Sequence, residues 1–450
     1  MFWGGTLAGV VLGLASVLSP TTIVFLLAMP VLFLWARRGL GPRERRWVCG
    51  VLAAAVLARL AVLAGFFLLA DHMKEPFAVF YPDERFILDR SLWLLRFGFG
   101  GAMAPSDYDL AFGEYGRSIL PNTLAVWQLW FGPAPYGVHL VSVAMWLTGA
   151  VALHRTARSA FGPMPALAGL VAVLFVPTLF AWSISVLKEP AYFLCMAMTI
   201  AGTMAVVRAE RLYAKVLAAA LVLVAVATIN PLRPIGLFVA AGGLAAAAAA
   251  WILTRRSWLF ALAIVIVVTA GGWAVRQPAV QARVLHEARA AAQIHRGHVV
   301  TRGYAYKLLE PYVYTGKLEL PLDNLPADEV ARFVVRAAAS FVTVPTPWDA
   351  ASASGLALIP QHVAWYILVP LVGLGAIGGW RRDRFFTWLL VCNAALGAGA
   401  VALFNGNVGT LVRMRDTVVT VLVWLGGLGA CIVLEWTARR FSERVQHGHS

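Results

Sequence analysis

The sequence predicts an all-α fold, a polytopic transmembrane helix bundle of about 12 spans with extracytoplasmic amphipathic helices. The first observation behind this prediction is composition: 60% of the 450 residues are apolar and only 13% are charged, more apolar surface than a soluble domain can bury. The second is a series of apolar runs that approach the ~20 residues a helix needs to cross ~30 Å of hydrocarbon. The third is the regular placement of Lys and Arg between these runs.

The expected spans follow the apolar runs in chain order. They are Gly4 to Leu18, Thr21 to Leu34, Val48 to Ala70, Tyr136 to Leu153, Pro163 to Trp182, Glu189 to Val207, Leu212 to Ile229, Ile235 to Thr254, Trp258 to Val275, His362 to Gly379, Phe385 to Phe404 and Leu411 to Glu435. The stretch from Met1 to Leu34 is too long for one ordinary span, and turn residues around Pro20 interrupt it, so a tight hairpin is predicted there. One tilted, kinked helix is the alternative.

Orientation follows from the cations in the short connections, because Lys and Arg resist translocation there. Every second connection is rich in them: Arg37, Arg38, Arg43, Arg45 and Arg46; Arg155 and Arg158; Arg208, Arg211 and Lys215; Arg255 and Arg256; Arg381, Arg382 and Arg384. These connections and both termini are therefore placed in the cytoplasm, with the chain integral to the cytoplasmic (inner) membrane. The net charge of +15 reflects this topology, so membrane lipid is an expected partner and nucleic acid is not.

The domain organisation predicted is a single integral membrane domain over residues 1–450. Two long segments interrupt it, the first extracytoplasmic loop over residues 71–121 and a second extracytoplasmic segment over residues 276–361. Loops of this length are uncommon unless they are functional. Within the second segment, Gln277 to His295 and Asn324 to Phe341 have the pattern of amphipathic helices, of the kind that lie on a membrane surface.

An acidic pair, Asp83 and Glu84, is the first candidate for chemistry, and it follows the third span in the first long loop. A carboxylate close to the membrane surface can act as a general base toward a hydroxyl group. Asp83 and Glu84 are therefore the candidate catalytic residues. The structural alternative is a pair of solvated loop charges.

Two short outer turns carry the next candidates. Lys188 and Glu189 lie in one of them, where topology disfavours a cation, and an ammonium binds phosphate as a point charge. Glu189 could orient this lysine, or the two could cap a helix whose first turn holds Pro190. Arg233 lies in the other turn. The sequence favours equally a contact with substrate and a simple role in the turn between two helices.

The stretch leading into the last expected span holds a third set of candidates, Asn407, Arg413 and Arg415. A helix start binds anions, and Thr410 is a plausible N-cap for it. Residues two apart on a helix point roughly 200° away from each other, so one phosphate cannot easily meet both arginines. Arg413 could instead pair with Asp416 at three residues' spacing, which favours Arg415 as the phosphate ligand.

Other polar residues leave their roles open. Arg59 lies in the middle of a span, where a charge requires a function or a buried partner that the sequence does not name. His286, His295 and His298 show no persuasive metal-ligand spacing. The sequence therefore identifies no metal ligands and no definite cofactor, and a divalent metal is left open.

Together these stretches resemble the GT-C superfamily of polyprenyl-phosphate-sugar-dependent membrane glycosyltransferases, or a related polysaccharide polymerase family. The Asp83-Glu84 pair is similar to that superfamily's most consistent motif, and the Lys188-Glu189 turn resembles a second site in some members. The stretch from Asn407 to Arg415 looks similar to one in uncharacterised bacterial membrane proteins of glycosyltransferase or polysaccharide-polymerase type. In the superfamily the acidic loop commonly follows the first span, and here it follows the third, which leaves the particular family open.

The resemblance implies an inverting displacement on the extracytoplasmic face. The donor would be a polyprenyl-phosphate-linked sugar, and the acceptor a glycan, a lipid or a protein. Asp83 would take the acceptor's proton. The departing lipid phosphate would be neutralised by Lys188, Arg413, Arg415 and Arg233.

Three other functions are left open by the sequence. An O-antigen-type polysaccharide polymerase or ligase also joins lipid-linked glycans outside the membrane. A transporter or lipid flippase needs essential charges near the midplane, and Arg59 is the one residue that supports this alternative. The third is a non-catalytic assembly subunit.

Overall fold

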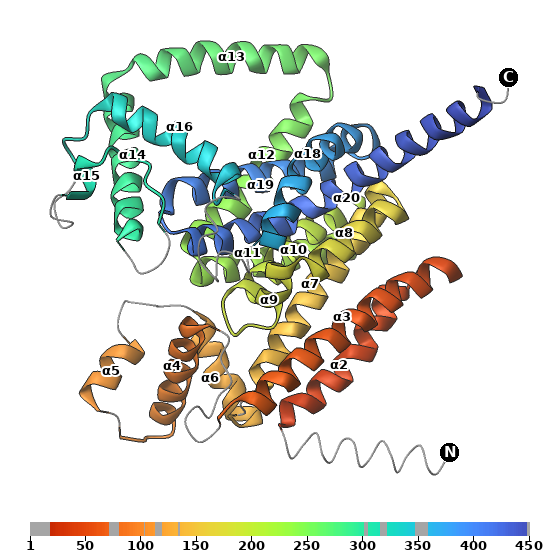
Figure 1. Cartoon of the computed structure of the whole chain (residues 1–450), viewed down its shortest axis with the longest axis vertical. Helices are drawn as coiled ribbons and strands as arrows, with labels where there is room; N and C mark the ends of the chain where they lie inside the picture. Colours follow the sequence, from red (N-terminus) through yellow and green to blue (C-terminus); the bar gives the residue numbers. More distant parts are fainter. Residues whose placement is uncertain are drawn as a thin grey trace. The chain divides into compact units, whose positions relative to one another are not determined.

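The computed structural model describes residues 19–71, 81–102, 104–112, 119–133, 136–300, 305–315, 322–346 and 359–447. Within these ranges the fold is all-α (Figure 1), and the only extended pairing is an isolated bridge between Ala305 and Asn407. Ten helices are long and apolar enough to cross a membrane, and a bent pair of helices raises the number to 11. The chain is therefore an integral membrane protein.

The described helices carry the labels of Figure 1. They are α2 (Pro20–Arg37), α3 (Pro42–Leu69), α4 (Pro82–Gly98), α5 (Pro105–Phe112), α6 (Ile119–Phe131), α7 (Gly137–Phe161), α8 (Pro163–Phe175), α9 (Pro177–Ser183), α10 (Glu189–Arg208), α11 (Leu212–Leu232), α12 (Pro234–Leu253), α13 (Ser257–Arg276), α14 (Pro278–Val299), α15 (Tyr312–Thr315), α16 (Ala327–Thr343), α18 (Ile359–Arg382), α19 (Arg384–Phe404) and α20 (Val408–His447).

Ten of the twelve expected spans coincide with single helices of this set, and α14 and α16 confirm the two helices expected in the second long segment. The expected span Gly4 to Leu18 lies outside the described residues. The expected span Pro163 to Trp182 is wrong as one straight helix, because α8 and α9 are bent by 67°. Pro177 causes the break: its ring holds Val176 in an extended conformation and removes one backbone donor.

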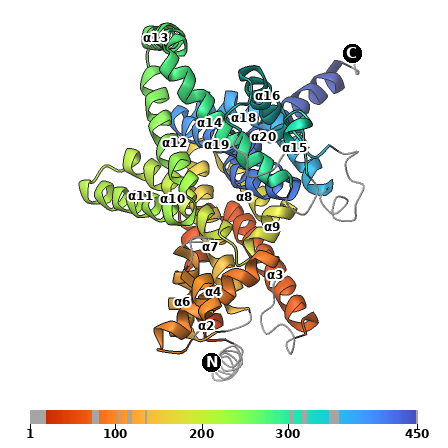
Figure 2. The same ribbon diagram turned by 90° about the vertical axis from the view of Figure 1, so that its left-hand side faces the viewer.

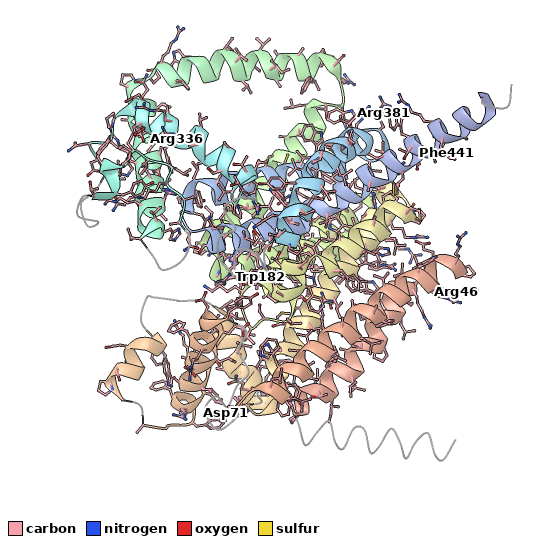
Figure 3. The ribbon with its side chains drawn as sticks, viewed as in Figure 1. Arg46, Asp71, Trp182, Arg336, Arg381 and Phe441 are labelled. Atoms are coloured by element: carbon pink, nitrogen blue, oxygen red, sulfur yellow. The ribbon has the colours of Figure 1, made fainter. Side chains whose placement is uncertain are left out.

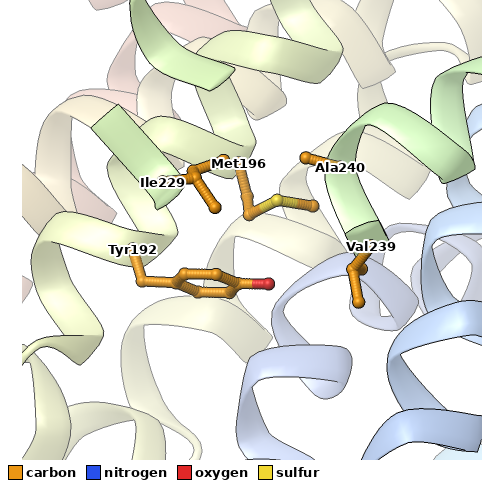
Figure 4. Close-up of a cluster of buried hydrophobic side chains, with 5 residues drawn as sticks. All are labelled: Tyr192, Met196, Ile229, Val239 and Ala240. Atoms are coloured by element: carbon orange, nitrogen blue, oxygen red, sulfur yellow. The ribbon is translucent and has the colours of Figure 1, made fainter. Parts of the chain in front are cut away.

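The chain forms two compact units. The first unit comprises the chain up to Ala240 and from Ala430 onward, and the second comprises Ala241 to Gly429. In the first unit α7 packs against α2, α8 and α10, and α10 lies alongside α11 (Figure 2). Five buried side chains fill the space beside α10 (Figure 4): Tyr192, Met196, Ile229, Val239 and Ala240.

Three basic connections of the first unit meet at one end of its helices. The Nε and Nη2 atoms of Arg158 donate to the two carboxylate oxygens of Glu44, at 2.5 and 2.8 Å. Arg155 donates to the backbone carbonyl of Arg38 at 2.8 Å. Arg208 donates to the hydroxyl of the serine that follows Arg158. The connections that the charge pattern placed on one side of the membrane therefore lie together.

The second unit has the same arrangement of a basic end. Beside Arg255, the hydroxyl of Thr254 accepts a hydrogen bond from the indole of Trp388 at 3.3 Å. The rings of Trp251 and Phe385 lie 5.1 Å apart. The connection between α12 and α13 and the connection between α18 and α19 therefore share one end of this unit. Arg381 in the latter connection is labelled in Figure 3.

Helix α13 differs from the other spans, because none of its residues is buried by the described parts of the chain. Its sequence is apolar on all sides of the helix between Trp258 and Val275. Lipid is the solvent that such a surface requires.

The tightest helix crossing of the second unit joins α18 to α20 through glycines. A Cβ atom built on Gly375 would lie 1.9 Å from the carbonyl oxygen of Leu425, and one built on Gly429 would lie 2.0 Å from that of Leu371. The two backbones therefore touch directly, as small residues allow at helix interfaces in lipid.

Replacing Gly375 by alanine is expected to destabilise the protein by about 1–3 kcal/mol, the usual cost of overpacking. The measurement is the thermal unfolding of the purified chain in detergent, with a lowered melting temperature as the expected result. Gly373→Ala is the matched control on the same helix, because a Cβ atom there would meet nothing within 4 Å. Equal melting temperatures for the two variants would contradict the close crossing.

Candidate functional site

Helix α4 presents the acidic pair in its first turn. The helix begins at Pro82 after an extended Tyr81. Asp83 and Glu84 then lie where the partial positive charge of the helix terminus stabilises carboxylates. The two side chains point differently: Asp83 is exposed, whereas Glu84 is completely buried.

Glu84 fixes the start of α4 to the segment between α9 and α10. Its Oε1 atom accepts a hydrogen bond of 3.0 Å from the backbone N–H of Val186. The ring of Tyr81, directly before α4, lies 4.7 Å from the ring of Trp182, which is labelled in Figure 3. These contacts anchor the first turn of α4, which includes Asp83, to the turn that carries Lys188.

The segment 184–188 is non-helical although nearly all of it is buried. Its backbone groups need partners, because an unpaired buried amide or carbonyl is costly. The carbonyl of Ile184 lies 2.7 Å from the Nδ1 atom of the buried His139. The hydroxyl of Ser185 donates to the carbonyl of Trp182 at 2.8 Å. With the bond from Val186 to Glu84, side chains from two other helices hold this turn.

Arg59, the charged residue in the middle of α3, contacts the chain just before this turn. Its Nε atom donates to the hydroxyl of Ser183 at 2.7 Å, and Nη1 and Nη2 donate to the carbonyls of Ala55 and Leu174 at 3.0 and 2.9 Å. The carbonyl of Leu174 lies directly before the break between α8 and α9. Arg59 therefore has a structural role in holding a broken helix. The sequence could not show this partner set, because Ser183 lies 124 positions away.

Glu189 and Arg233 join the two short turns that precede α10 and α12. The Nη2 atom of Arg233 lies 2.5 Å from Oε1 of Glu189, with 13% and 3% of the two side chains exposed. The guanidinium also lies 5.5 Å from the centre of the Tyr192 ring. Lys188 precedes Glu189 as the N-cap residue of α10 and is half-buried. Arg233 is thus neutralised by a carboxylate.

In the second unit, Asn407 begins the last helix. Its Oδ1 atom accepts hydrogen bonds from the backbone N–H groups of Gly409 and Thr410, at 2.9 and 3.3 Å. The expectation that Thr410 is the N-cap is therefore wrong. An asparagine three residues earlier satisfies these amides, and α20 starts at Val408. Consequently Arg413 and Arg415 both lie inside the helix and face different directions.

A histidine secures the chain directly before α20. The Nδ1 atom of His295 lies 2.7 Å from the carbonyl oxygen of Asn405, and its Nε2 atom lies 3.1 Å from the hydroxyl of Tyr314. Tyr306 donates to the same carbonyl at 2.6 Å. Burial lowers the pKa of His295 to about 4, so the ring is neutral near neutral pH. Burial likewise raises the pKa of Tyr306.

These hydrogen bonds account for His295 without a metal, since both of its ring nitrogens have partners. The Nδ1 atom of His298 lies 2.7 Å from the carbonyl oxygen of Phe404. Among the residues that the structure describes, no three His, Cys, Asp or Glu side chains come together as a metal site.

Arg415 is buried to 1% exposure. Its Nη1 atom donates to the carbonyls of Phe341 and Val344, at 3.2 and 2.8 Å, and the guanidinium carbon lies 4.7 Å from the centre of the Trp365 ring. The Nε and Nη2 atoms have no hydrogen-bond partner among the described residues. Two carbonyls and one aromatic ring therefore hold the guanidinium in place, while its Nε and Nη2 atoms remain available as donors.

The neighbouring Asp416 has a partner from α18. Its Oδ1 atom accepts a hydrogen bond of 3.0 Å from the Nε2 atom of Gln361. Arg413 is half-buried on another side of α20. Arg415, one of the two arginines predicted as phosphate ligands, is held within the unit by the carbonyls of Phe341 and Val344.

The candidate residues thus form two sets. The first unit brings Asp83 and Glu84 to the turn of Lys188, and Glu189 to Arg233. The second unit holds the other three on the first two turns of α20: Asn407, Arg413 and Arg415. Sequence reasoning missed His139 and His362, because an isolated histidine in an apolar helix carries no motif.

Fold and site define a class of protein, an integral membrane helix bundle with polar clusters opposite the basic ends of its units. No family model matches the chain, and neither the curated proteins nor the solved structures include a match.

The two members of the acidic pair are expected to differ in their effect on stability. Glu84→Ala removes the acceptor of a buried N–H and should cost about 1–3 kcal/mol. Asp83→Ala, at the adjacent exposed position, should cost less than about 1 kcal/mol. Thermal unfolding in detergent measures both, and a Glu84 variant as stable as the Asp83 variant would contradict the anchoring role.

Proposed function

We propose that the protein is a GT-C-like glycosyltransferase, which moves a sugar from a polyprenyl-phosphate donor to an extracytoplasmic acceptor by inverting displacement. The observation that carries this proposal is the division between Asp83 and Glu84. One carboxylate is buried and anchors the first turn of α4, and the other is held exposed beside a turn with a cation. A rigidly placed base next to a cation is what transfer from a lipid phosphate to a hydroxyl requires.

The proposed reaction uses Asp83 as the general base. Its carboxylate takes the proton of an acceptor hydroxyl, and the oxygen attacks the anomeric carbon of the donor sugar. The bond from that carbon to the phosphate oxygen breaks, and its electron pair leaves with the lipid phosphate. Because a single displacement occurs, the configuration at the anomeric carbon inverts, unlike the double displacement of retaining hydrolases.

Charge on the leaving phosphate requires a nearby cation, and electrostatic stabilisation of this kind usually contributes more to catalysis than any other effect. Lys188 is the candidate in the first unit, because it lies on the turn to which Glu84 is anchored. Arg233 is paired with Glu189 and therefore positions this turn. Arg413 and Arg415, predicted from the sequence as phosphate ligands, lie on α20 in the second unit, and Asn407 sets the start of that helix.

The transporter alternative rested on Arg59. Its guanidinium donates to three neutral oxygen atoms, those of Ser183, Ala55 and Leu174. A structural role therefore explains this charge without any transported substrate.

Orientation forms part of the proposal, and the positive-inside rule supports it. In each unit the basic connections share one end, which supports placing that end in the cytoplasm. The acidic pair of the first unit lies at the opposite end, which is reached along α7 from Arg155 to His139.

Cysteine labelling tests this orientation in a variant that lacks the four native cysteines. Ser106 on α5 and Ser257 at the start of α13 are both exposed. A membrane-impermeant maleimide added to intact cells should label Ser106→Cys, and should label Ser257→Cys only after permeabilisation. The reverse pattern would overturn the proposed orientation.

Asp83→Asn is expected to reduce sugar transfer by at least about 10²-fold, the typical contribution of a general base. The assay uses purified protein with radiolabelled polyprenyl-phosphate sugars and a membrane extract that supplies acceptors. Asp109→Asn is the matched control, because Asp109 is an exposed carboxylate on the neighbouring α5. Full transfer by Asp83→Asn would remove this residue as the base, and no transfer by the wild type with any donor would overturn the proposed function.

A further inference from the structure

One edge of the Arg415 guanidinium, formed by Nε and Nη2, has no hydrogen-bond partner among the described residues. An arginine has five N–H donors in a planar fork. In Arg415, Nη1 is bonded to the carbonyls of Phe341 and Val344, whereas Nε and Nη2 have no partner among the described residues. Nε and Nη2 lie on the same edge of the fork, and this edge binds two oxygens of a carboxylate or phosphate in parallel.

Such an edge is costly to leave empty inside a protein. An unpaired buried donor destabilises the fold, and more strongly when the group is charged. Arg415 is only 1% exposed, so ordinary hydration of this edge is largely prevented. Buried donors without partners are uncommon in folded proteins and require an explanation.

His362 supplies a second donor of the same kind. This residue is 5% exposed, and its Nδ1 atom has no partner among the described residues. It lies within electrostatic range of the Arg415 guanidinium. The adjacent Gln361 is held by Asp416, which fixes the first turn of α18 against α20. Two buried groups with nitrogens unpartnered in the described chain therefore lie next to the two residues whose hydrogen bond joins α18 to α20.

We propose that Arg415 and His362 form a buried binding site for a phosphate group. Two phosphate oxygens would accept hydrogen bonds from Nε and Nη2 of Arg415, and a third would accept one from the imidazole of His362. A phosphate group has enough oxygens to give each of these three donors an acceptor of its own. In naming a lipid-linked phosphate as its natural source, this inference rests on the proposed function. The binding itself does not depend on transfer activity.

The test measures phosphate binding to the full chain in detergent by isothermal titration calorimetry. The probes are inorganic phosphate, farnesyl phosphate and farnesol, which carries the same tail without the charge. Wild type should bind at least one phosphate probe. Arg415→Lys should weaken that binding by about tenfold, because an ammonium cannot reproduce the bidentate fork. His362→Gln should weaken it by several fold and keeps the test decisive if Arg415→Lys does not fold.

Arg289→Lys is the matched control in the same unit. Both Nε and Nη2 of Arg289 already donate to the carbonyl of Leu325, at 3.1 and 2.7 Å, so its edge is occupied. This variant should bind the probes like wild type. None of the probes carries a sugar, so the measurement is independent of the transfer reaction.

Tighter binding of farnesyl phosphate than of inorganic phosphate, with little binding of farnesol, supports the site and identifies a lipid source. Equal binding of the two phosphates supports the site for free phosphate. The proposal is overturned if neither phosphate binds wild type, or if folded Arg415→Lys and His362→Gln bind as wild type does.

Discussion

Backbone polarity in a lipid environment is the constraint on which the rest of this structure depends. Within hydrocarbon every N–H and C=O group needs an internal partner, so a non-helical segment is tolerated only where protein surrounds it. The turn 184–188 is such a segment. Glu84 and His139 supply its partners from α4 and α7, and Arg59 holds the helix break just before it. This requirement therefore gives a structural explanation for Glu84, which the sequence predicted to be catalytic, and for Arg59, the charged residue in the middle of a span.

The same constraint gives the acidic pair its two roles. A buried carboxylate that accepts a backbone N–H cannot easily give up its position, so Glu84 holds the first turn of α4 in place. The backbone of the neighbouring Asp83 is thereby anchored, while its side chain is exposed. The rate of a catalysed reaction depends strongly on how precisely a reacting group is positioned. Here the position of the first turn of α4 follows from the hydrogen bond between Glu84 and the backbone N–H of Val186.

The sequence predicted the fold well because its strongest signals are local. Apolar length located ten of the spans, and the placement of cations correctly grouped the connections at the basic end of each unit. The break at Pro177 was missed because the flanking residues are as apolar as those of a straight span. The sequence identified candidate site residues from their chemical type and position, but it did not identify the residues that they contact. The pairing of Glu189 with Arg233, and of Arg59 with Ser183, spans 44 and 124 positions, a separation at which no periodicity operates.

Helix α13 is under a different constraint, since the described parts of the chain bury none of its side chains. Side chains that face fluid hydrocarbon do not have to fit the shape of a fixed neighbour. Selection there acts weakly on the shape of a side chain and strongly on its polarity. Exchanging one aliphatic residue for another along this helix should therefore be almost neutral, and a single charge at its middle should be severe. Divergence between relatives of this protein would then accumulate fastest in a segment that still cannot become hydrophilic.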